Sequence, residues 1–167
     1  MPKPGYPQQL EPGVCAVLPT PFGALGIATT GEAIAGIHFL PPGTPEQPPR
    51  HALAEMAWEQ LSRYLADPHW LFDLPLAPRG TDHQLRVWNE IRRIPCGEVR
   101  RYGELSSSIR SAARAVGQAC GANPLPVVVP CHRVVSASGL GGFANARDGF
   151  LVDTKRWLLQ HEGAWPR

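Results

Sequence analysis

Cys131 and His132 stand next to each other inside a hydrophobic stretch that runs from Val127 to Val135. A thiolate is a strong nucleophile, but a free cysteine has a pKa of about 8.5 and is mostly protonated at neutral pH. A neighbouring base or cation raises the thiolate fraction, and His132 and Arg133 are candidates for that help. The pair therefore indicates nucleophilic chemistry. The alternative is an inert core cysteine beside a surface histidine, because buried free cysteines are common.

The stretch around this pair predicts a buried strand that is interrupted at the cysteine. Valine is β-branched and favours strands, whereas Pro130 lacks an amide donor and excludes a regular central strand at that point. Side chains of neighbouring strand residues point to opposite faces. Cys131 and His132 can therefore share one site only across a turn or through a water molecule.

Length and composition predict a globular protein of one domain or two small ones. The chain has 167 residues, of which 43% are hydrophobic and 18% are charged. No apolar run approaches the roughly 20 residues needed to span a bilayer, and we find no signal peptide. The four cysteines, at 15, 96, 120 and 131, lack paired C-x-x-C spacing. We therefore expect reduced thiols in a cytoplasmic protein.

Positive charge is concentrated in one part of the chain. The net charge is only +2, but seven arginines against three glutamates lie between Arg86 and Arg114. This local excess, in a segment that also predicts helices, indicates nucleic acid as a partner.

The first half of the chain predicts a small α+β lobe. Residues 1–12 have the composition of a loose tail, and short apolar runs at 14–18, 24–29 and 33–40 predict an antiparallel β-meander. Helical spacing follows from His51 to Ala66. Residues 70–78 are extended and proline-rich, so we place a domain boundary near residue 78, with an N-terminal lobe at 1–78 and a second domain at 79–167.

The second domain is expected to be mostly helical. Thr81 and Gln84 have capping-box spacing at the start of one helix, and further helices are predicted at 102–109, at 112–120 with Ser111 as cap, and at 155–162 with Asp153 or Thr154 as cap. The two central helices, followed by a short active-site strand, have the outline of a helix-turn-helix. A helical hairpin with a tightly packed alanine face is the alternative.

Four motifs occur together in this half: Pro130-Cys131-His132-Arg133-Val134, Arg114-Ala115-Val116-Gly117, Asn123-Pro124, and the segment from Trp157 to Gly163. In this combination, residues from about 79 to 163 resemble the O6-alkylguanine-DNA alkyltransferases, also called methylated-DNA-protein-cysteine methyltransferases. The resemblance implies a monomeric, cytoplasmic, nucleoid-associated repair protein that needs no cofactor. It implies base flipping and a single, irreversible transfer of an alkyl group from O6-alkylguanine in duplex DNA to the protein.

The resemblance also implies roles for individual residues. Cys131 would accept the alkyl group, His132 would take the thiol proton through a water, Glu162 would orient the imidazole, and Asn123 would brace the cysteine-bearing segment. Arg114 would enter the base stack, and Tyr102 would press on a flanking phosphate. The remaining expected contacts to DNA or the flipped base are Ala115, Gly117, Arg133, Val134, Phe143 and Ala144.

The helix around Arg114 is built from small residues, which in the resemblance would dock in the narrow minor groove. Such a groove admits a helix closely only if its face is nearly bare. The residues expected on this face are Ala112, Ala113, Ala115, Val116, Gly117 and Ala119. Cys96 and Cys120 are interpreted as bystanders, with Cys120 packed under the helix.

Two features depart from the family pattern. Phe143 stands where relatives usually have a tyrosine whose hydroxyl helps the guanine leave, and residues 144–152 form a differently composed loop, which puts the backbone donor role of Ala144 in question. Two other functions stay open: a lesion-binding sensor that does not transfer the alkyl group, and a cysteine hydrolase. No metal is expected, because the nearest candidates lack ligand spacing: Cys15, His38, His51 and His69.

Overall fold

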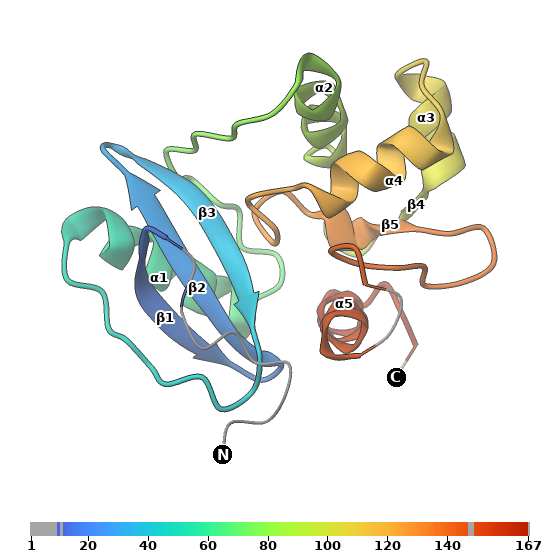
Figure 1. The fold of residues 1–167 in the computed structure, drawn as a ribbon. Helices are drawn as coiled ribbons and strands as arrows, with labels where there is room; N and C mark the ends of the chain where they lie inside the picture. The colour runs from blue at the N-terminus through green and yellow to red at the C-terminus, as the bar shows by residue number, and fades with distance from the viewer. Residues whose placement is uncertain (1–9, 11, 147–148, 167) are drawn as a thin grey trace. The chain divides into compact units, whose positions relative to one another are not determined.

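The computed structural model describes residue 10, residues 12–146 and residues 149–166. The chain forms two compact units (Figure 1). The first extends to Ala66 and includes Trp70–Ala77, and the second comprises Asp67–His69 and the chain from Pro78 onward. The predicted loose tail falls almost entirely outside the described residues.

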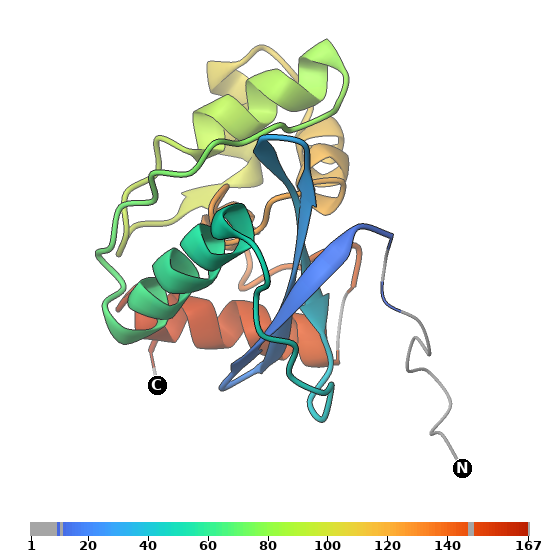
Figure 2. The same ribbon diagram turned by 90° about the vertical axis from the view of Figure 1, so that its left-hand side faces the viewer.

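The first unit contains the predicted meander and helix. Strands β1 (Val14–Thr20), β2 (Gly23–Thr30) and β3 (Ala33–Leu40) form an antiparallel sheet in the order β1-β2-β3. Helix α1 (Ala52–Ala66) packs against the sheet (Figure 2) and buries Leu61 and Tyr64. The β-branched and small apolar side chains of the strands fill the space below it, so this unit has a core of its own.

The extended segment Trp70–Ala77, which follows α1, belongs to the first unit. Ile34 donates a backbone hydrogen bond to Pro75 and accepts one from Ala77, at 2.8 Å and 3.1 Å. The stretch therefore lies beside β3 as an added edge segment.

The second unit is mostly helical, as predicted. It contains α2 (Asp82–Ile91), β4 (Arg100–Arg101), α3 (Tyr102–Ser108), α4 (Ala113–Gly121), the 3-10 turn η1 (Cys131–Arg133), β5 (Val134–Val135) and α5 (Phe150–His161). Strands β4 and β5 pair in parallel. Trp88 of α2 donates its indole hydrogen to the backbone oxygen of Ala119 in α4 at 2.8 Å, which ties these two helices together. The expected α+β fold class is confirmed.

Local signals predicted some helix ends and missed others. The capping box at Thr81 is present, with Thr81 Oγ1 accepting from Gln84 N at 3.1 Å and Gln84 Oε1 accepting from Thr81 N at 2.9 Å. Ser111 does not cap α4: its hydroxyl pairs with His83 Nε2 at 2.8 Å, and Ala112 is the N-cap.

The last helix begins earlier than expected, at Phe150 instead of Lys155. Its N-cap is Gly149, so neither Asp153 nor Thr154 is a cap. The Thr154 hydroxyl donates to the backbone oxygen of Phe150 at 2.7 Å, inside the helix. A threonine that bonds the preceding turn in this way is interior, which is why its cap-like identity was misleading.

The cysteine-bearing stretch is not a long strand. Val127 has a positive φ of 74°, Cys131 lies in the turn η1, and only Val134 and Val135 are in a strand. The five valines of this stretch predicted a strand, but Pro130 and the tight turn limit it to two residues. Over the described residues, no helix has both the length and the apolar character needed to cross a membrane.

Candidate active site

Asn123 holds the turn that carries Cys131. Its side-chain amide donates to the backbone oxygen of Val129 at 2.9 Å and to Cys131 Sγ at 3.1 Å. Its carbonyl accepts from the backbone nitrogen of Leu125 at 2.9 Å. One side chain thus connects both ends of the loop before η1, and it also supplies a hydrogen bond that favours a negatively charged sulfur.

Glu162 lies between His132 and Arg133 at the end of α5. Its carboxylate pairs with His132 Nε2 at 2.8 Å, and it accepts from Arg133 Nε at 2.8 Å and from Arg133 Nη2 at 3.0 Å. Arg133 also donates to the backbone oxygen of Ile94 at 2.6 Å. Burial raises the pKa of Glu162, but the hydrogen bonds from His132 and Arg133 and the positive charge of Arg133 outweigh it and hold that pKa well below the usual range.

This arrangement fixes which nitrogen of His132 carries the proton. Burial lowers the pKa of His132 against the opposing effect of Glu162, so the ring is neutral near neutral pH. An ionised carboxylate only accepts hydrogen bonds, so Nε2 must be the N–H and Nδ1 the lone pair. Nδ1 is buried and has no hydrogen-bond partner among the described residues. It is a base with its lone pair unused.

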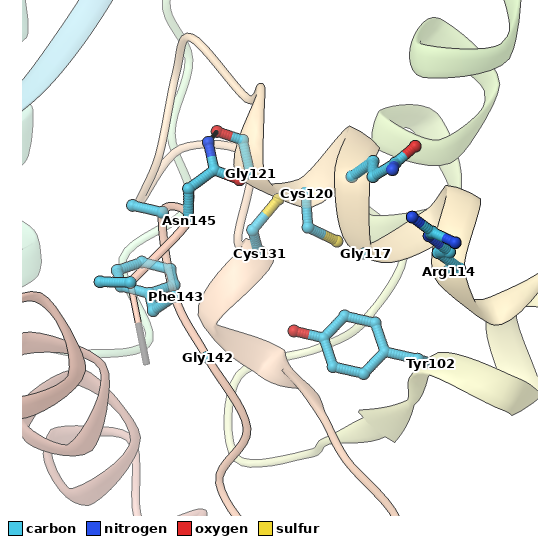
Figure 3. A pocket seen from close by; sticks show the side chains of 12 residues that line it. Tyr102, Arg114, Gly117, Cys120, Gly121, Cys131, Gly142, Phe143 and Asn145 are labelled. Carbon is cyan, nitrogen blue, oxygen red and sulfur yellow. Dashed lines mark hydrogen bonds between the residues drawn. The ribbon is translucent and has the colours of Figure 1, made fainter. Parts of the chain in front are cut away.

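Cys131 forms part of the wall of a cavity of about 380 Å³ (Figure 3). The walls come from α3, α4, η1 and the loop before α5, and the lining residues are Tyr102, Arg114, Gly117, Gln118, Cys120, Gly121, Cys131, Gly142, Phe143, Ala144, Asn145 and Ala146. Asn145 donates to the backbone oxygen of Gly121 at 3.2 Å, which connects the loop to α4. A cavity of this size can hold a small aromatic ligand.

The thiol of Cys131 is protonated in the resting protein. Burial raises its pKa well above the ordinary value, and the neighbouring Cys120 thiol adds to that effect. Asn123 and the charge of Lys155 lower it in part. Burial and the two thiols likewise raise the pKa of Tyr102, so its phenol stays a hydrogen-bond donor. Nucleophilic use of Cys131 therefore needs a proton acceptor.

Two residues of the site were missed by the sequence analysis. Lys155 is fully buried, and its ammonium donates to the backbone oxygens of Val134 at 2.8 Å and Gly142 at 3.0 Å. Once α5 is known to begin at Phe150, Lys155 falls on the same helical face as Val152 and Leu159, which is the signal that could have revealed it.

Cys120 was expected to be a bystander packed under the helix, and its expected position is wrong. Its side chain lines the cavity and interacts with Cys131 (Figure 3). Cys120 lies one helical turn after Gly117, on the face of α4 that borders the cavity.

The remaining predicted residues fall into two groups. Tyr102, Arg114, Gly117, Phe143 and Ala144 line the cavity. Ala115, Arg133 and Val134 do not.

The three residues outside the lining have other surroundings. Arg133 is engaged with Glu162. Val134 is fully buried, with its backbone oxygen bound to Lys155. Ala115 is half-buried on α4.

The expected bare face of α4 needs correction. Val116 and Ala119 are buried in the core of the second unit and cannot belong to it. Ala112, Ala113 and Arg114 are exposed, and a Cβ at Gly117 would meet no atom within 4 Å. The open face of the helix is therefore smaller than predicted, because two of the six expected residues are packed in the core on the side where α4 contacts α2 and α3.

Comparisons with known proteins agree with this site. Residues 82–164 match the sequence profile described as 6-O-methylguanine DNA methyltransferase, DNA binding domain. The methylated-DNA–protein-cysteine methyltransferase of Methanosarcina acetivorans is 36% identical over 89% of this chain and 97% of its own length. The protein of the same name from Mycobacterium tuberculosis is 39% identical over 86% of this chain and 88% of its own length.

Solved structures give the same answer. The crystal structure of Mycobacterium tuberculosis O6-methylguanine methyltransferase superposes with a TM-score of 0.76 at 39% identity, over 90% of this chain and 93% of that one. The mycobacterial protein in complex with DNA superposes with a TM-score of 0.73 at 38% identity, over 89% of this chain and 91% of that one. On sequence and fold together, the chain belongs to the methylated-DNA–protein-cysteine methyltransferase family and is an enzyme of that class.

Proposed function

We propose that this protein repairs DNA directly, by moving the alkyl group of O6-alkylguanine in duplex DNA onto its own Cys131. The transfer is irreversible and happens once per molecule, because the thioether it forms is not cleaved. The observation that carries the proposal is the buried, unpartnered Nδ1 of His132, fixed as a lone pair by Glu162, beside a cavity with Cys131 in its wall.

The proton of Cys131 leaves first. His132 Nδ1 accepts it through one water molecule, and Glu162, held ionised, stabilises the imidazolium that results. Asn123 and the ammonium of Lys155 lower the cost of negative charge on the sulfur. The thiolate then attacks the alkyl carbon, so that a carbon–sulfur bond forms as the carbon–oxygen bond breaks, and the guanine takes a proton.

A hydrogen-bond donor is needed at the departing guanine. Phe143 supplies an aromatic wall but no donor, so Tyr102 is the phenol of the described lining that can assist. Its raised pKa keeps it protonated while the reaction proceeds. The backbone of Ala144, in the same wall, is a further donor.

The damaged base must leave the duplex to reach Cys131, which is 3% exposed. We propose that α3 and α4 dock in the minor groove, about 6 Å wide, with the open space at Gly117 allowing close approach. Exposed Arg114, at the first turn of α4, would fill the vacated place in the stack, and Tyr102 would contact a flanking phosphate. Ala115 adds little bulk next to Arg114. The protein is proposed to act on DNA as a monomer.

One experiment tests the transfer. A duplex with a single labelled O6-methylguanine is incubated with the protein, and the tryptic peptide 115–133, which contains both Cys120 and Cys131, is sequenced by fragmentation in the mass spectrometer. We expect one methyl group on Cys131, none with Cys131→Ala, and normal transfer with the control Cys96→Ala. Tight binding of the lesion without methylation would instead identify a sensor, and release of a small product with turnover would identify a hydrolase.

A further inference from the structure

The cavity contains two thiols, although one is enough to accept an alkyl group. Cys131 comes from η1 and Cys120 from the last turn of α4, and both are free. Figure 3 shows the two side chains next to each other in the cavity wall. Transfer of a simple methyl group leaves Cys120 without a task.

The surroundings of the two sulfurs are shared. The Cys120 thiol raises the pKa of Cys131. Burial lowers the pKa of the Lys155 ammonium and both thiols partly oppose that effect, so that the pKa is about 8 instead of 10.5. A cation that senses both sulfurs can stabilise negative charge on either one. The second thiol is thus held in the same electrostatic environment as the first.

We propose that Cys120 is a second acceptor, which acts after Cys131 on lesions whose alkyl group carries its own leaving group, such as O6-(2-haloethyl)guanine. This inference rests on the proposed transfer to Cys131. It names a class of substrate, the two-carbon bis-electrophiles on guanine O6, for which a single-thiol pocket would give an unstable product.

The reaction consists of two successive nucleophilic displacements. In the first, the Cys131 thiolate attacks the carbon bonded to guanine O6, the carbon–oxygen bond breaks, and the guanine leaves with a proton. This gives a 2-haloethyl thioether on Cys131. In the second, Cys120 attacks the carbon that carries the halogen, a second carbon–sulfur bond forms, halide leaves, and the thiol proton passes to water. The product is a dithioether, with two carbons between the sulfurs.

The position of the two thiols favours attack of Cys120 on the haloethyl group over attack by water. The two side chains lie next to each other in the cavity wall (Figure 3), and a two-carbon bridge can join two sulfurs that are farther apart than the about 2.05 Å of a disulfide. Groups held in this way react with an effective concentration of about 10⁵ M or more. The near-complete burial of Cys131 limits access by water.

Formation of the dithioether also protects the repaired DNA. A 2-haloethyl thioether is itself an alkylating agent and lies beside the duplex that has just been repaired. Capture by Cys120 removes that reactivity inside the protein. A covalent link between protein and DNA is the outcome that the second thiol prevents.

The test uses a duplex with one O6-(2-chloroethyl)guanine, followed by iodoacetamide and trypsin. Peptide 115–133 contains both thiols, so a bridged peptide carries a two-carbon unit without chlorine or hydroxyl and takes up no carbamidomethyl group. This is the expected product. A chloroethyl or hydroxyethyl group on Cys131 beside a carbamidomethylated Cys120 would overturn the inference.

Variants and a parallel substrate separate the two proposals. Cys120→Ser and Cys120→Ala should lose the bridge and gain hydroxyethyl product and protein–DNA adducts, whereas Cys96→Ser should keep the bridge. A second portion of each preparation is incubated with a duplex that contains O6-methylguanine, which measures the fraction of protein molecules able to accept a methyl group. The amount of bridged peptide is then divided by that fraction. Methyl transfer without any bridge would overturn this inference alone, and loss of methyl transfer in the unaltered protein would overturn both.

Discussion

Glu162 Oε2 and His132 Nε2 lie 2.8 Å apart, and both side chains are completely buried. The contact joins η1 to the end of α5, which are 30 residues apart in the sequence. It determines that the opposite nitrogen of the ring has the lone pair. The position of α5 therefore sets the chemistry of a residue next to Cys131, and changes in that helix should act on the reaction.

The first prediction concerns this pair. In Glu162→Gln the ring loses its fixed tautomer and Arg133 loses its buried partner. We expect methyl transfer to slow by roughly 10²-fold or more, the lower end of what a general base contributes. The free energy of unfolding should fall by about 3–5 kcal/mol, the usual result of removing one partner of a buried ion pair. Single-turnover kinetics and urea unfolding measure the two effects.

Glu90→Gln is the matched control, because Glu90 also pairs with arginines, Arg93 and Arg100, but outside the cavity. Its transfer rate should equal that of the unaltered protein. A folded Glu162→Gln protein with an unchanged rate would rule out the role assigned to the pair.

The second prediction concerns Lys155 and pH. Its pKa is lowered from 10.5 to about 8 in the folded protein, so between these values the unfolded chain binds more protons than the folded one. The contribution of Lys155 to stability must then rise with pH from about 8 to about 10.5, with a slope of at most about 1.4 kcal/mol per pH unit. Cys131 and Tyr102, whose pKa values are raised, contribute with the opposite sign.

The measurement is therefore a difference between two proteins. Lys155→Met keeps most of the apolar stem and removes the titrating group. We expect the stability of the unaltered protein, minus that of the variant, to increase as pH rises through this window. A constant difference would contradict the lowered pKa.

The sequence predicted elements whose signals are local. The capping box of Thr81 and Gln84 depends on residues three apart, and the meander depends on alternating short apolar runs and turns, so both could be predicted without the structure. The family motifs located Cys131, His132 and Glu162. What they could not give is the tautomer, which depends on burial and on a contact across 30 residues.

The features that the sequence analysis missed or predicted wrongly depend on contacts between residues far apart in the sequence. Lys155 binds backbone oxygens 21 and 13 residues away, and no short pattern encodes such contacts. Ser111 has the identity of a cap but finds His83, 28 residues earlier. Val116 and Ala119 were predicted to belong to an open face because they are small, but both are buried, and Trp88 of α2 is bonded to the backbone of Ala119. In each case a tertiary partner competed with the local one and replaced it.

The third prediction concerns Arg114, which is exposed and borders the cavity. Arg114→Ala should slow transfer from duplex DNA far more than transfer from the free base O6-benzylguanine, since only the duplex requires a base to be extruded. Arg156→Ala, an exposed arginine of α5 paired with Asp153, is the control and should affect neither substrate. Equal losses on both substrates would contradict the proposed insertion of Arg114.

The fourth prediction compares two glycines of α4. A Cβ at Gly117 would meet nothing within 4 Å, so Gly117→Ala should fold and gain up to about 1 kcal/mol from helix propensity. A Cβ at Gly121 would overlap the amide of Asn145, so Gly121→Ala should displace the loop and slow transfer even from the free base. Thermal unfolding and rates on both substrates distinguish the two variants. Similar behaviour would show that contact with Asn145 does not shape the cavity.

The fifth prediction restores a donor. Phe143 is 7% exposed, lines the cavity and lies with its ring centroid 6.0 Å from the Lys155 ammonium. Phe143→Tyr keeps the aromatic wall and adds a hydroxyl that can donate to the departing guanine. One such hydrogen bond contributes about 0.5–1.5 kcal/mol, so we expect transfer from O6-methylguanine duplex to accelerate by roughly 2- to 12-fold.

Phe39→Tyr, on β3 of the first unit, adds the same hydroxyl outside the cavity and should leave the rate unchanged. Tyr102→Phe should slow the reaction more in the unaltered protein than in Phe143→Tyr, because the new phenol takes over part of the donation. If the two changes are instead independent of each other, or if Phe143→Tyr is folded and no faster, then departure of the guanine is not limited by a missing donor at residue 143.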